Sequence, residues 1–497
     1  MSTPERHDLT RFVLLRGLGG IWFVTFLIWW RQAPLLVGSE GLTPLRLFLD
    51  RARAVHGEDA FLALPTLFWF DSSDAAIAAV GLLGMALGAA VALGLTNAFA
   101  QLTLWALTLS IVNGGQHWYG FGWEMLMCEM SFLSISLAPW RGLGPRGLAP
   151  PPRAVIWGFR WLVFRLLLGA GLIKLRGDPC WTELSCLATH YETQPNPHPG
   201  SWLFHQAPMA FHQAGALFNH LVELVLPWFV FGPRWPRRIA AVGLVAFQLL
   251  LIASGNLAFF NWLSLVLGLA VFDDEALARP WPSLRAWLRP ALPATAGLAT
   301  WSARTLLAGA VVLVIWRSVP VVDNLFFAED QAMNRSYDPL RLVNTYGAFG
   351  SVGEEREELV LQGTADDPED PDATWLDYEF PCKPGDPMRA PCFITPYHLH
   401  LDWQLWFVPL QGIDRNPWVA HLIAKLLDHQ PLARAALAHD PFPDSPPRAI
   451  RAARYRYRFT GPGEPGWWTR EFIGLRVRPL TRDDPALKAA LERYGWR

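Results

Sequence analysis

Long apolar stretches without charged residues constrain this chain more than any other feature. Residues 75–95 and residues 239–272 contain no Asp, Glu, Lys or Arg. A helix crosses the hydrocarbon core of a bilayer, about 30 Å thick, with roughly 20 apolar residues, and each of these stretches is at least that long. A chain with such segments is predicted to be a multi-pass integral membrane protein, because only helices and closed barrels satisfy the backbone in lipid.

Nine stretches are candidates for membrane-spanning helices. The stretch 239–272 is too long for one span, and the Ser-Gly-Asn turn signal at 254–256 divides it into two. The candidates are residues 12–30, 75–95, 98–112, 121–140, 155–173, 214–232, the two halves of 239–272, and 305–320. The first follows basic residues as a signal peptide does, but no small-residue cleavage motif follows it, so we interpret it as an uncleaved anchor. The sequence thus predicts an α-helical membrane domain of about eight or nine spans over residues 1–320.

Composition supports the membrane prediction and argues against nucleic acid as a partner. Hydrophobic residues make up 52% of the chain and charged residues only 17%, whereas soluble domains contain about 25%. The 26 tryptophans fit membrane interfaces, where one end of the ring is wet and the other dry. The net charge of -1 supplies no positive field for nucleic acid. We therefore expect membrane lipid, and no nucleic acid, among the partners.

The arginines orient the predicted spans. Cytoplasmic loops carry an excess of Lys and Arg, so we place the N-terminus in the cytoplasm. The arginines of this segment and of three later loops on the same side are Arg6, Arg11, Arg141, Arg146, Arg153, Arg234, Arg237, Arg238, Arg279, Arg285 and Arg289. The long first loop goes against the rule. An odd number of spans then places the loop 176–211 and the domain 321–497 outside the cytoplasm. The membrane would be that of the endoplasmic reticulum in a eukaryote or the inner membrane in a bacterium, with the domain lumenal or periplasmic.

Residues 321–497 are predicted to form a β-rich α+β extracytoplasmic domain. Aromatic and β-branched stretches bounded by Pro, Gly and Asp are typical of strands. They cover residues 358–363, 374–380, 398–408, 453–460 and 470–478. Between them, apolar residues at helical spacing predict short helices over 418–427 and 431–439.

Ionisable residues inside the predicted spans are candidates for function, because a charge in hydrocarbon is costly unless it is paired. Glu129 and Arg165 lie on the fourth and fifth spans. Each is about 16 Å from the loop that joins the two spans, at 1.5 Å per residue, so we predict a buried ion pair. A pair that only packs the helices and a pair that takes part in catalysis both remain open.

His220 and Glu223 are further intramembrane candidates. They are three residues apart in the sixth span and share a helix face, a spacing that fits a proton relay or half of a metal site. Structural metal sites usually have four ligands, and no second His-x-x-Glu element completes such a set, so we predict no metal site. Lys174, at the end of the fifth span, is also a candidate.

The outer loop 176–211 is rich in histidine, and His190, Tyr191 and Glu192 lie at its centre. Such density invites a catalytic interpretation. However, the chain contains no nucleophile elbow, P-loop, Gly-rich dinucleotide turn or His-Glu-x-x-His motif. The alternative is an interfacial loop that packs on the outer domain. We predict no catalytic residue and no cofactor.

Four of the five cysteines form two close pairs on the predicted outer side. These are Cys180 with Cys186 and Cys382 with Cys392, whereas Cys128 lies alone in an apolar run. In an oxidising compartment such pairs are expected to be structural disulfides. Closing loops of this size would contribute about 2–3 kcal/mol in the chain-entropy model. Neither pair has Cys-x-x-Cys spacing, which argues against a thioredoxin-like redox site, yet thiol–disulfide exchange remains the alternative.

Several longer motifs resemble one known family. They are KLRGDPCW at 174–181, HYETQP at 190–195, NHLVE at 219–223, SGN at 254–256 with NW at 261–262, NTYGAFGS at 344–351, YEFPCKPGD at 378–386, and PYH at 396–398 with LDW at 401–403. Taken in order, they make the chain resemble the lipase maturation factor family over nearly its whole length. The N-terminal 110 residues or so match least clearly.

The resemblance implies a chaperone-like factor of the endoplasmic reticulum membrane, not an enzyme, that assists the folding and assembly of secreted dimeric lipases such as lipoprotein lipase. It implies client binding by the outer region, about residues 330–497, and it leaves room for a redox role of the four outer cysteines. A secreted lipase or another exported protein is the expected client. Trp467 and Trp468 follow a Gly-Pro loop, so we expect them to be exposed as an apolar client surface.

Two other classes of function remain as alternatives. An intramembrane enzyme or a thiol–disulfide oxidoreductase would use the outer cysteine pairs together with Lys174, Glu129, His220 and Glu223. A transporter is less favoured, because the chain lacks matched Gly- or Pro-broken helices in two halves.

Overall fold

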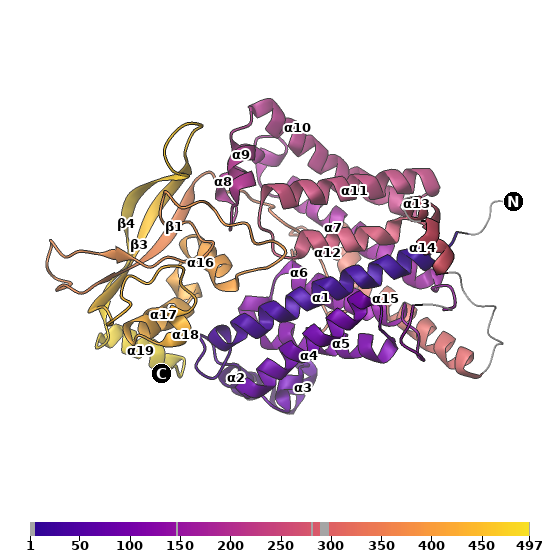
Figure 1. The fold of residues 1–497 in the computed structure, drawn as a ribbon, viewed down its shortest axis with the longest axis horizontal. Coiled ribbons are helices and arrows are strands. Elements are labelled where there is room, and N and C mark those ends of the chain that lie inside the picture. The colour runs from indigo at the N-terminus through magenta and orange to yellow at the C-terminus, as the bar shows by residue number, and fades with distance from the viewer. Residues whose placement is uncertain (1–4, 146–147, 280–281, 289–297, 497) are drawn as a thin grey trace.

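The computed structural model describes residues 5–145, 148–279, 282–288 and 298–496. Long helices make up the N-terminal part, and a four-stranded sheet with short helices makes up most of the rest (Figure 1). The N-terminus and α13 (Asp274–Ala278) lie at one end of the long helices, and the sheet lies beyond the other end. The two faces that a membrane would separate are therefore occupied by different parts of the chain.

Six helices in the described part of the chain are long and apolar enough to cross a membrane, by length and composition. They are α1 (Asp8–Leu36), α4 (Asp74–Leu93), α7 (Arg153–Arg176), the segment Met209–Phe231, α11 (Arg234–Ser254), and Arg304–Phe326 within α15 (Leu298–Phe326). The sequence predicted about eight or nine spans. The other three predicted spans correspond to the shorter helices α5 (Ala98–Gly114), α6 (Gly122–Ile135) and α12 (Phe260–Gly268).

Glycines let α1 and α4 approach each other closely. Gly81, Gly84 and Gly88 of α4 all face α1. A Cβ atom on Gly84 would overlap the ring of Phe26, and one on Gly88 would lie 2.7 Å from the backbone nitrogen of Phe23. In lipid, helices associate through such close packing of small residues, because the surrounding acyl chains are as apolar as the helices.

The sixth predicted span is not a continuous α-helix. It consists of α10 (Met209–His220), the π-helical turn η5 (Leu221–Val225) and the 3-10 helix η6 (Leu226–Phe231). Pro227 follows the π-helical turn, and a proline inside a helix removes one backbone donor and clashes with the carbonyl group four residues earlier. Single π-helical turns often occur at functional sites, and this one contains Glu223.

Several short helices lie in the loops that connect the long helices. α8 (Leu187–Thr193) and α9 (Pro199–His205) form the outer loop, on the side of the sheet (Figure 1). The first loop and the segment before α15 contain α2 (Leu45–His56), α3 (Ala60–Ala63) and α14 (Pro282–Trp287).

The sheet is antiparallel with strand order β2-β1-β3-β4. Its strands are β1 (Arg356–Thr364), β2 (Leu376–Asp377), β3 (Ala449–Phe459) and β4 (Trp468–Thr481). The sequence predicted β1, β3 and β4 correctly. Of the strand predicted over 374–380, only the two residues of β2 join the ladder.

Short helices cover one face of this sheet. They are α16 (His400–Gln411), α17 (Trp418–Leu427), α18 (Pro431–Arg434) and α19 (Pro485–Arg493). Leu361 of β1, Leu405 of α16 and Leu422 of α17 belong to one buried apolar cluster, so the sheet and the helices share a core.

The strand predicted over residues 398–408 was wrong, because most of this segment is the helix α16. Apolar and aromatic residues alternate in it, which suggested a strand. The buried residues Leu401, Leu405 and Val408 also follow an i, i+4, i+7 pattern, which is that of a helix face. Short apolar runs fit both periods, and packing on β1 selects the helix. The helix predicted over 431–439 is real but ends early, at Arg434.

Candidate functional site

A cavity of about 750 Å³ lies where the membrane helices meet the outer loop and α16. Most of its lining is aromatic or aliphatic and includes Phe218, Leu251 and Trp406. The polar side chains in the lining include Lys174, His190, Tyr191, Asn219, Glu223, Gln248 and Asn261. A largely apolar space with a few convergent polar groups is the usual form of a ligand or substrate site. Four of the residues singled out from the sequence therefore line one cavity.

Lys174, in the last turn of α7, is paired with Glu223 of the π-helical turn. Its Nζ atom lies 2.7 Å from Oε1 and 2.6 Å from Oε2 of Glu223. Asn219, one turn before Glu223, accepts a hydrogen bond from Lys174 Nζ at 3.1 Å and donates one to Glu223 Oε2 at 3.0 Å. Both charged residues are only 4% exposed, so each needs its partner. The pair cancels its own charge and leaves the cavity suited to uncharged groups.

His220 and Glu223, which the sequence places on one helix face, have different partners in the structure. The Nε2 atom of His220 lies 2.9 Å from the carbonyl oxygen of Trp181, and His220 is not among the residues that line the cavity. The turn η5 is π-helical, which changes the angular spacing between its residues.

A second polar pair in the cavity was missed from the sequence. Asn261 of α12 donates a hydrogen bond at 2.8 Å to Gln248 Oε1 of α11, and both side chains are buried. Amides at this depth are hydrogen-bonded because an unpaired amide in hydrocarbon is costly. The sequence feature that could have indicated this pair is the presence of two amide side chains within a stretch that is otherwise apolar.

The three central residues of the outer loop have different roles. His190 packs edge-on against Phe349 at 4.6 Å between ring centroids, and burial, with a smaller effect of Lys174, lowers the pKa of its imidazole to about 4. Burial raises the pKa of the Tyr191 hydroxyl to about 12. Both residues are therefore neutral near pH 7 and line the cavity. Glu192 points elsewhere: its Oε2 atom accepts a hydrogen bond at 2.6 Å from the backbone N–H of Phe459 in β3.

Glu129 and Arg165 lie in direct contact, in the ion pair expected from the sequence. Both are at most 2% exposed. A segment of the C-terminal part completes the cluster: Arg165 donates to the carbonyl oxygen of Asn344 at 2.7 Å, and the Tyr346 hydroxyl donates to Glu129 Oε2 at 2.9 Å. None of these four residues lines the cavity. Their arrangement joins α6 and α7 to the chain that follows α15.

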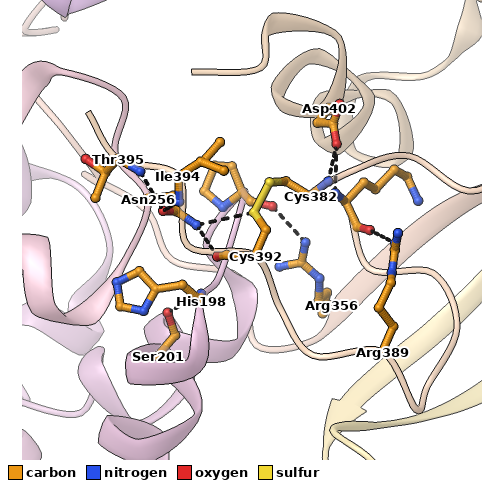
Figure 2. The surroundings of a disulfide bond; sticks show 12 residues. His198, Ser201, Asn256, Arg356, Cys382, Arg389, Cys392, Ile394, Thr395 and Asp402 are labelled. Carbon is orange, nitrogen blue, oxygen red and sulfur yellow. Dashed lines mark hydrogen bonds between the residues drawn. A yellow bond between two sulfur atoms is a disulfide. The ribbon is translucent and has the colours of Figure 1, made fainter. Parts of the chain in front are cut away.

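The disulfide between Cys382 and Cys392 lies at the junction of the two parts of the chain (Figure 2). Asn256, in the turn between α11 and α12, donates to the carbonyl oxygen of Cys392 at 2.8 Å. On the other side, Asp402 of α16 accepts the backbone N–H groups of Cys382 and Lys383 at 2.6 and 2.9 Å. Burial raises the pKa of Asp402 to about 6, although both N–H groups favour its charged form. The crosslinked loop thus bridges a membrane turn and a helix of the outer part.

The other cysteine pair closes a tight turn after α7. Cys180 and Cys186 form a disulfide, with their Cα atoms 4.8 Å apart. Trp181 within this turn donates a hydrogen bond from its indole N–H to the carbonyl oxygen of Phe349 at 2.8 Å. Cys128 is buried in α6 and has a free thiol.

Trp467 and Trp468 are not an exposed surface, which corrects the expectation from the sequence. Trp468 is 3% exposed and stacks on Phe459 at 4.1 Å between ring centroids. Trp467 is half-buried and packs against Trp202 of α9 at 5.6 Å. Residues next to a Gly-Pro loop are exposed only if no other segment packs over them, and here α9 of the outer loop packs over Trp467.

A buried charge cluster in the outer part was also missed. Glu358 of β1 forms ion pairs with Arg356 and with Lys383, each at 2.6 Å. Arg356 also donates to the carbonyl oxygens of Glu192 and Pro195 in the outer loop, both at 2.9 Å. The sequence feature that could have indicated this cluster is Glu358 itself, an acidic residue at an inward-facing position of a predicted strand. Within the described residues, no group of three His, Cys, Asp or Glu side chains could hold a metal ion.

Comparison with known proteins shows which family this chain resembles in sequence. The family model of the lipase maturation factor transmembrane domain matches residues 9–279, and that of the lipase maturation factor C-terminal domain matches residues 342–478. The chain is 44% identical to lipase maturation factor 1 of Bos taurus over 506 residues. This alignment covers 96% of this chain and 90% of the relative.

Two human relatives are also matched over most of their length. The identity to lipase maturation factor 1 of Homo sapiens is 43%, over 98% of this chain and 90% of the relative. The identity to lipase maturation factor 2 of Homo sapiens is 29%, over 98% of this chain and 85% of the relative. No solved structure matches the chain.

Proposed function

Because the chain belongs to the lipase maturation factor family, we propose that it is a membrane-embedded factor that assists the folding and assembly of secreted lipases or other exported proteins. The observation that carries this proposal is the similarity to lipase maturation factor 1 of Bos taurus, which extends through the helices, the outer loop and the sheet alike. The names of the relatives supply the client class.

The proposed orientation places the N-terminus in the cytoplasm and the sheet in the lumen of the endoplasmic reticulum or in the periplasm. Arginine supports it: Arg153, Arg234 and Arg238 lie at the beginnings of α7 and α11, the helix ends remote from the sheet. An arginine-rich face is typically cytoplasmic. Both disulfides then lie on the oxidising side.

The proposed membrane domain covers residues 1–320 and includes α5, α6 and α12 beside the six long helices. Support for α5 comes from its 17 residues without a charge, which reach about 25 Å at 1.5 Å per residue. α6 and α12 are too short to cross the bilayer alone. The buried Glu129 of α6 and Asn261 of α12 both have partners on neighbouring helices, as polar groups within a membrane require.

The proposed client surface lies on β4, in the outer domain formed by residues 321–497. Phe472 and Leu475 are 52% and 44% exposed. They pair with Tyr455 and Ala453, two residues apart on β3, so both side chains lie on the sheet face that is opposite α16 and α17. An incompletely folded lipase exposes apolar segments, and exposed apolar side chains next to an unpaired strand edge suit such segments.

The cysteine pairs act in this proposal as static crosslinks. Cys186 is 1% exposed and Cys382 is 4% exposed, whereas Cys180 and Cys392 are half-buried, so an attacking thiolate could approach only one of the two sulfurs in each disulfide without a local opening of the fold. Their contribution is to hold the turn after α7 and the loop before α16 in place.

Secretion of an active lipase tests the proposed function. The chain is expressed together with lipoprotein lipase in animal cells that lack their own lipase maturation factors, and lipase activity per milligram of secreted lipase is measured. We expect the wild-type chain to raise this specific activity about tenfold or more above that of cells with empty vector. No increase, with the chain present in the endoplasmic reticulum membrane, would refute the proposal for this client.

A further inference from the structure

A basic cavity lies between the beginnings of α7 and α11, on the membrane face that carries the N-terminus. Its volume is about 420 Å³. Its lining contains four arginines, Arg153, Arg160, Arg234 and Arg237, together with His7 and one acidic residue, Glu5. The assigned function uses none of these residues, and a cavity with this charge suits an anion.

The arginines of this cavity are only partly neutralised. Carboxylates do neutralise two of them: Arg234 pairs with Asp273 at 3.2 Å and contacts Glu275, and Arg237 pairs with Glu5 at 2.9 Å and with Asp273 at 3.4 Å. Arg160 has no carboxylate partner among the described residues: its Nε atom donates to the carbonyl oxygen of Ala270 at 3.3 Å, and its Nη2 atom has no hydrogen-bond partner. Arg160 is only 3% exposed, so an unpaired guanidinium is held inside the protein next to an open space. A buried charge of this kind calls for a counter-charge.

An apolar groove adjoins the basic cavity. Its volume is about 740 Å³, and it runs between α15 and the helices α6 and α7. The stacked rings of Trp157 and Phe231, 5.6 Å apart, line both the groove and the cavity. The rest of the groove is lined mostly by aliphatic side chains, including Val155 and Val311. In the most apolar part of α15 only 11% of the residues are buried. This helix therefore does not pack tightly on α7, which leaves the groove between them.

The depth of Arg160 matches that of a lipid phosphate. Arg160 is seven residues from the first residue of α7, Arg153, which is about 10 Å along the helix. The headgroup region of a bilayer is roughly 5–8 Å thick on each side. The guanidinium therefore lies near the boundary between headgroups and acyl chains, with a cationic cavity on one side and an apolar groove on the other.

We propose that the Arg160 cavity and the adjoining groove together bind one anionic glycerophospholipid from the leaflet that carries the N-terminus. The phosphate oxygens accept hydrogen bonds from Arg160, and one acyl chain occupies the groove between α7 and α15. A soluble phosphate would use only the cavity, and a zwitterionic lipid would bring its own cation against the arginines, so both should bind less well. Basic pockets between transmembrane helices recognise lipid headgroups in this way.

Native mass spectrometry of the detergent-purified full-length protein tests the proposal. The protein is titrated with phosphatidylglycerol, phosphatidylserine, phosphatidylcholine or inorganic phosphate. We expect one tightly retained anionic lipid, with about tenfold weaker retention of phosphatidylcholine and of phosphate. Arg160→Gln should weaken retention of the anionic lipid about tenfold, as loss of a hydrogen bond to a charged group does.

Two further variants make the test decisive. Arg16→Gln is the matched control, because Arg16 is eight residues from the beginning of α1, at a similar depth on the same face, and lines neither cavity. Val311→Trp fills the groove without touching the cations and should also weaken lipid retention, which keeps the test valid if Arg160→Gln does not fold. Equal losses in Arg16→Gln and Arg160→Gln, or equal retention of phosphatidylcholine, would overturn the proposal. So would binding of phosphate alone as tight as that of lipid.

Discussion

At the scale of single residues, Lys174 and Glu223 form a buried ion pair. The lysine Nζ atom is 2.6 Å from the carboxylate, and the cavity around the pair is mostly apolar. Lys174→Met leaves the carboxylate buried and unpaired, which is expected to reduce the free energy of unfolding by about 3–5 kcal/mol. Removing both charges, with Lys174→Met and Glu223→Leu together, should restore most of this loss. The midpoint of thermal unfolding in detergent, followed by tryptophan fluorescence, measures both effects.

Glu183→Gln is the control for this pair, because Glu183 is an exposed residue of the same outer loop. A surface substitution of this kind is expected to change the free energy of unfolding by less than about 0.5 kcal/mol. A double variant as unstable as Lys174→Met alone would show that the two charges do not compensate each other.

A second residue-scale prediction concerns the pH dependence that Asp402 introduces. Burial raises the pKa of Asp402 to about 6 in the folded protein, whereas an Asp side chain in the unfolded chain has a pKa of 3.8. The stabilisation is therefore complete at low pH and is lost as the pH rises from about 4 to 6. Between pH 5 and pH 7.5, wild type should lose about 1.4 kcal/mol relative to Asp402→Asn. Thermal unfolding of both proteins at the two pH values measures the difference.

The buried histidines have the opposite pH dependence. They are present in both proteins, so their contribution cancels when the free energy of unfolding of Asp402→Asn is subtracted from that of wild type at each pH. Burial lowers the pKa of His190 to about 4 and that of His398 to about 3, so these residues destabilise the fold as the pH falls below 6.5 in both proteins. A pH dependence that is unchanged by Asp402→Asn would mean that this carboxyl is already ionised at pH 5.

At the scale of elements, the packing of α1 on α4 depends on single glycines. Gly84→Ala places a Cβ atom against the ring of Phe26, whereas Gly20→Ala on α1 places it where no atom lies within 4 Å. Overpacking is expected to cost about 1–3 kcal/mol in the first variant. The second should be neutral or slightly stabilising, because alanine favours a helix over glycine by about 0.5–1 kcal/mol. Thermal unfolding compares them, and equal behaviour would exclude close contact of the two helices.

The same scale shows what the sequence could predict. The long spans were predictable because twenty apolar residues have few other structures available to them, and β1 was predictable from its own composition. α16 was not, because Leu401, Trp403 and Leu405 alternate as in a strand, and only contact with β1 selects the helix. The π-helical turn at Glu223 was not predictable either, and the sequence did not reveal that this carboxylate pairs with Lys174.

At the scale of the whole molecule, polar contacts between distant segments hold the segments that follow α15 against the long helices and their loops. Arg165 reaches Asn344, Asn256 reaches Cys392, and Arg356 reaches Glu192. Each pair is separated by more than a hundred residues, so no local pattern in the sequence could reveal it. Arg165 was visible as a charge in an apolar segment and Asn256 as part of a turn signal, whereas Arg356 was not noticed, and none of these three contacts was predicted.

Arg356→Met should loosen the outer loop while the helices stay folded. The substitution removes the donor to the carbonyl oxygens of Glu192 and Pro195 and leaves Glu358 with only Lys383. Hydrogen–deuterium exchange of peptides from residues 186–205 is expected to accelerate about tenfold or more, since local opening becomes easier there, with little change in α1 and α4. Arg458→Met is the control, because Arg458 is 63% exposed by its side chain and its ion pair on β3 is worth little. Equal acceleration in both variants would argue against this contact as an anchor.

The most direct test of a client-binding outer domain is site-specific photo-crosslinking in cells that express a secreted lipase. A photoreactive amino acid replaces Phe472 on β4 or, in a matched chain, Leu82 on α4, which is 50% exposed and lies in a predicted span. We expect the lipase to be captured from position 472 during its maturation and not from position 82. Capture from position 82 alone, or from neither position while lipase activity is restored, would contradict the placement of the client surface on the outer domain.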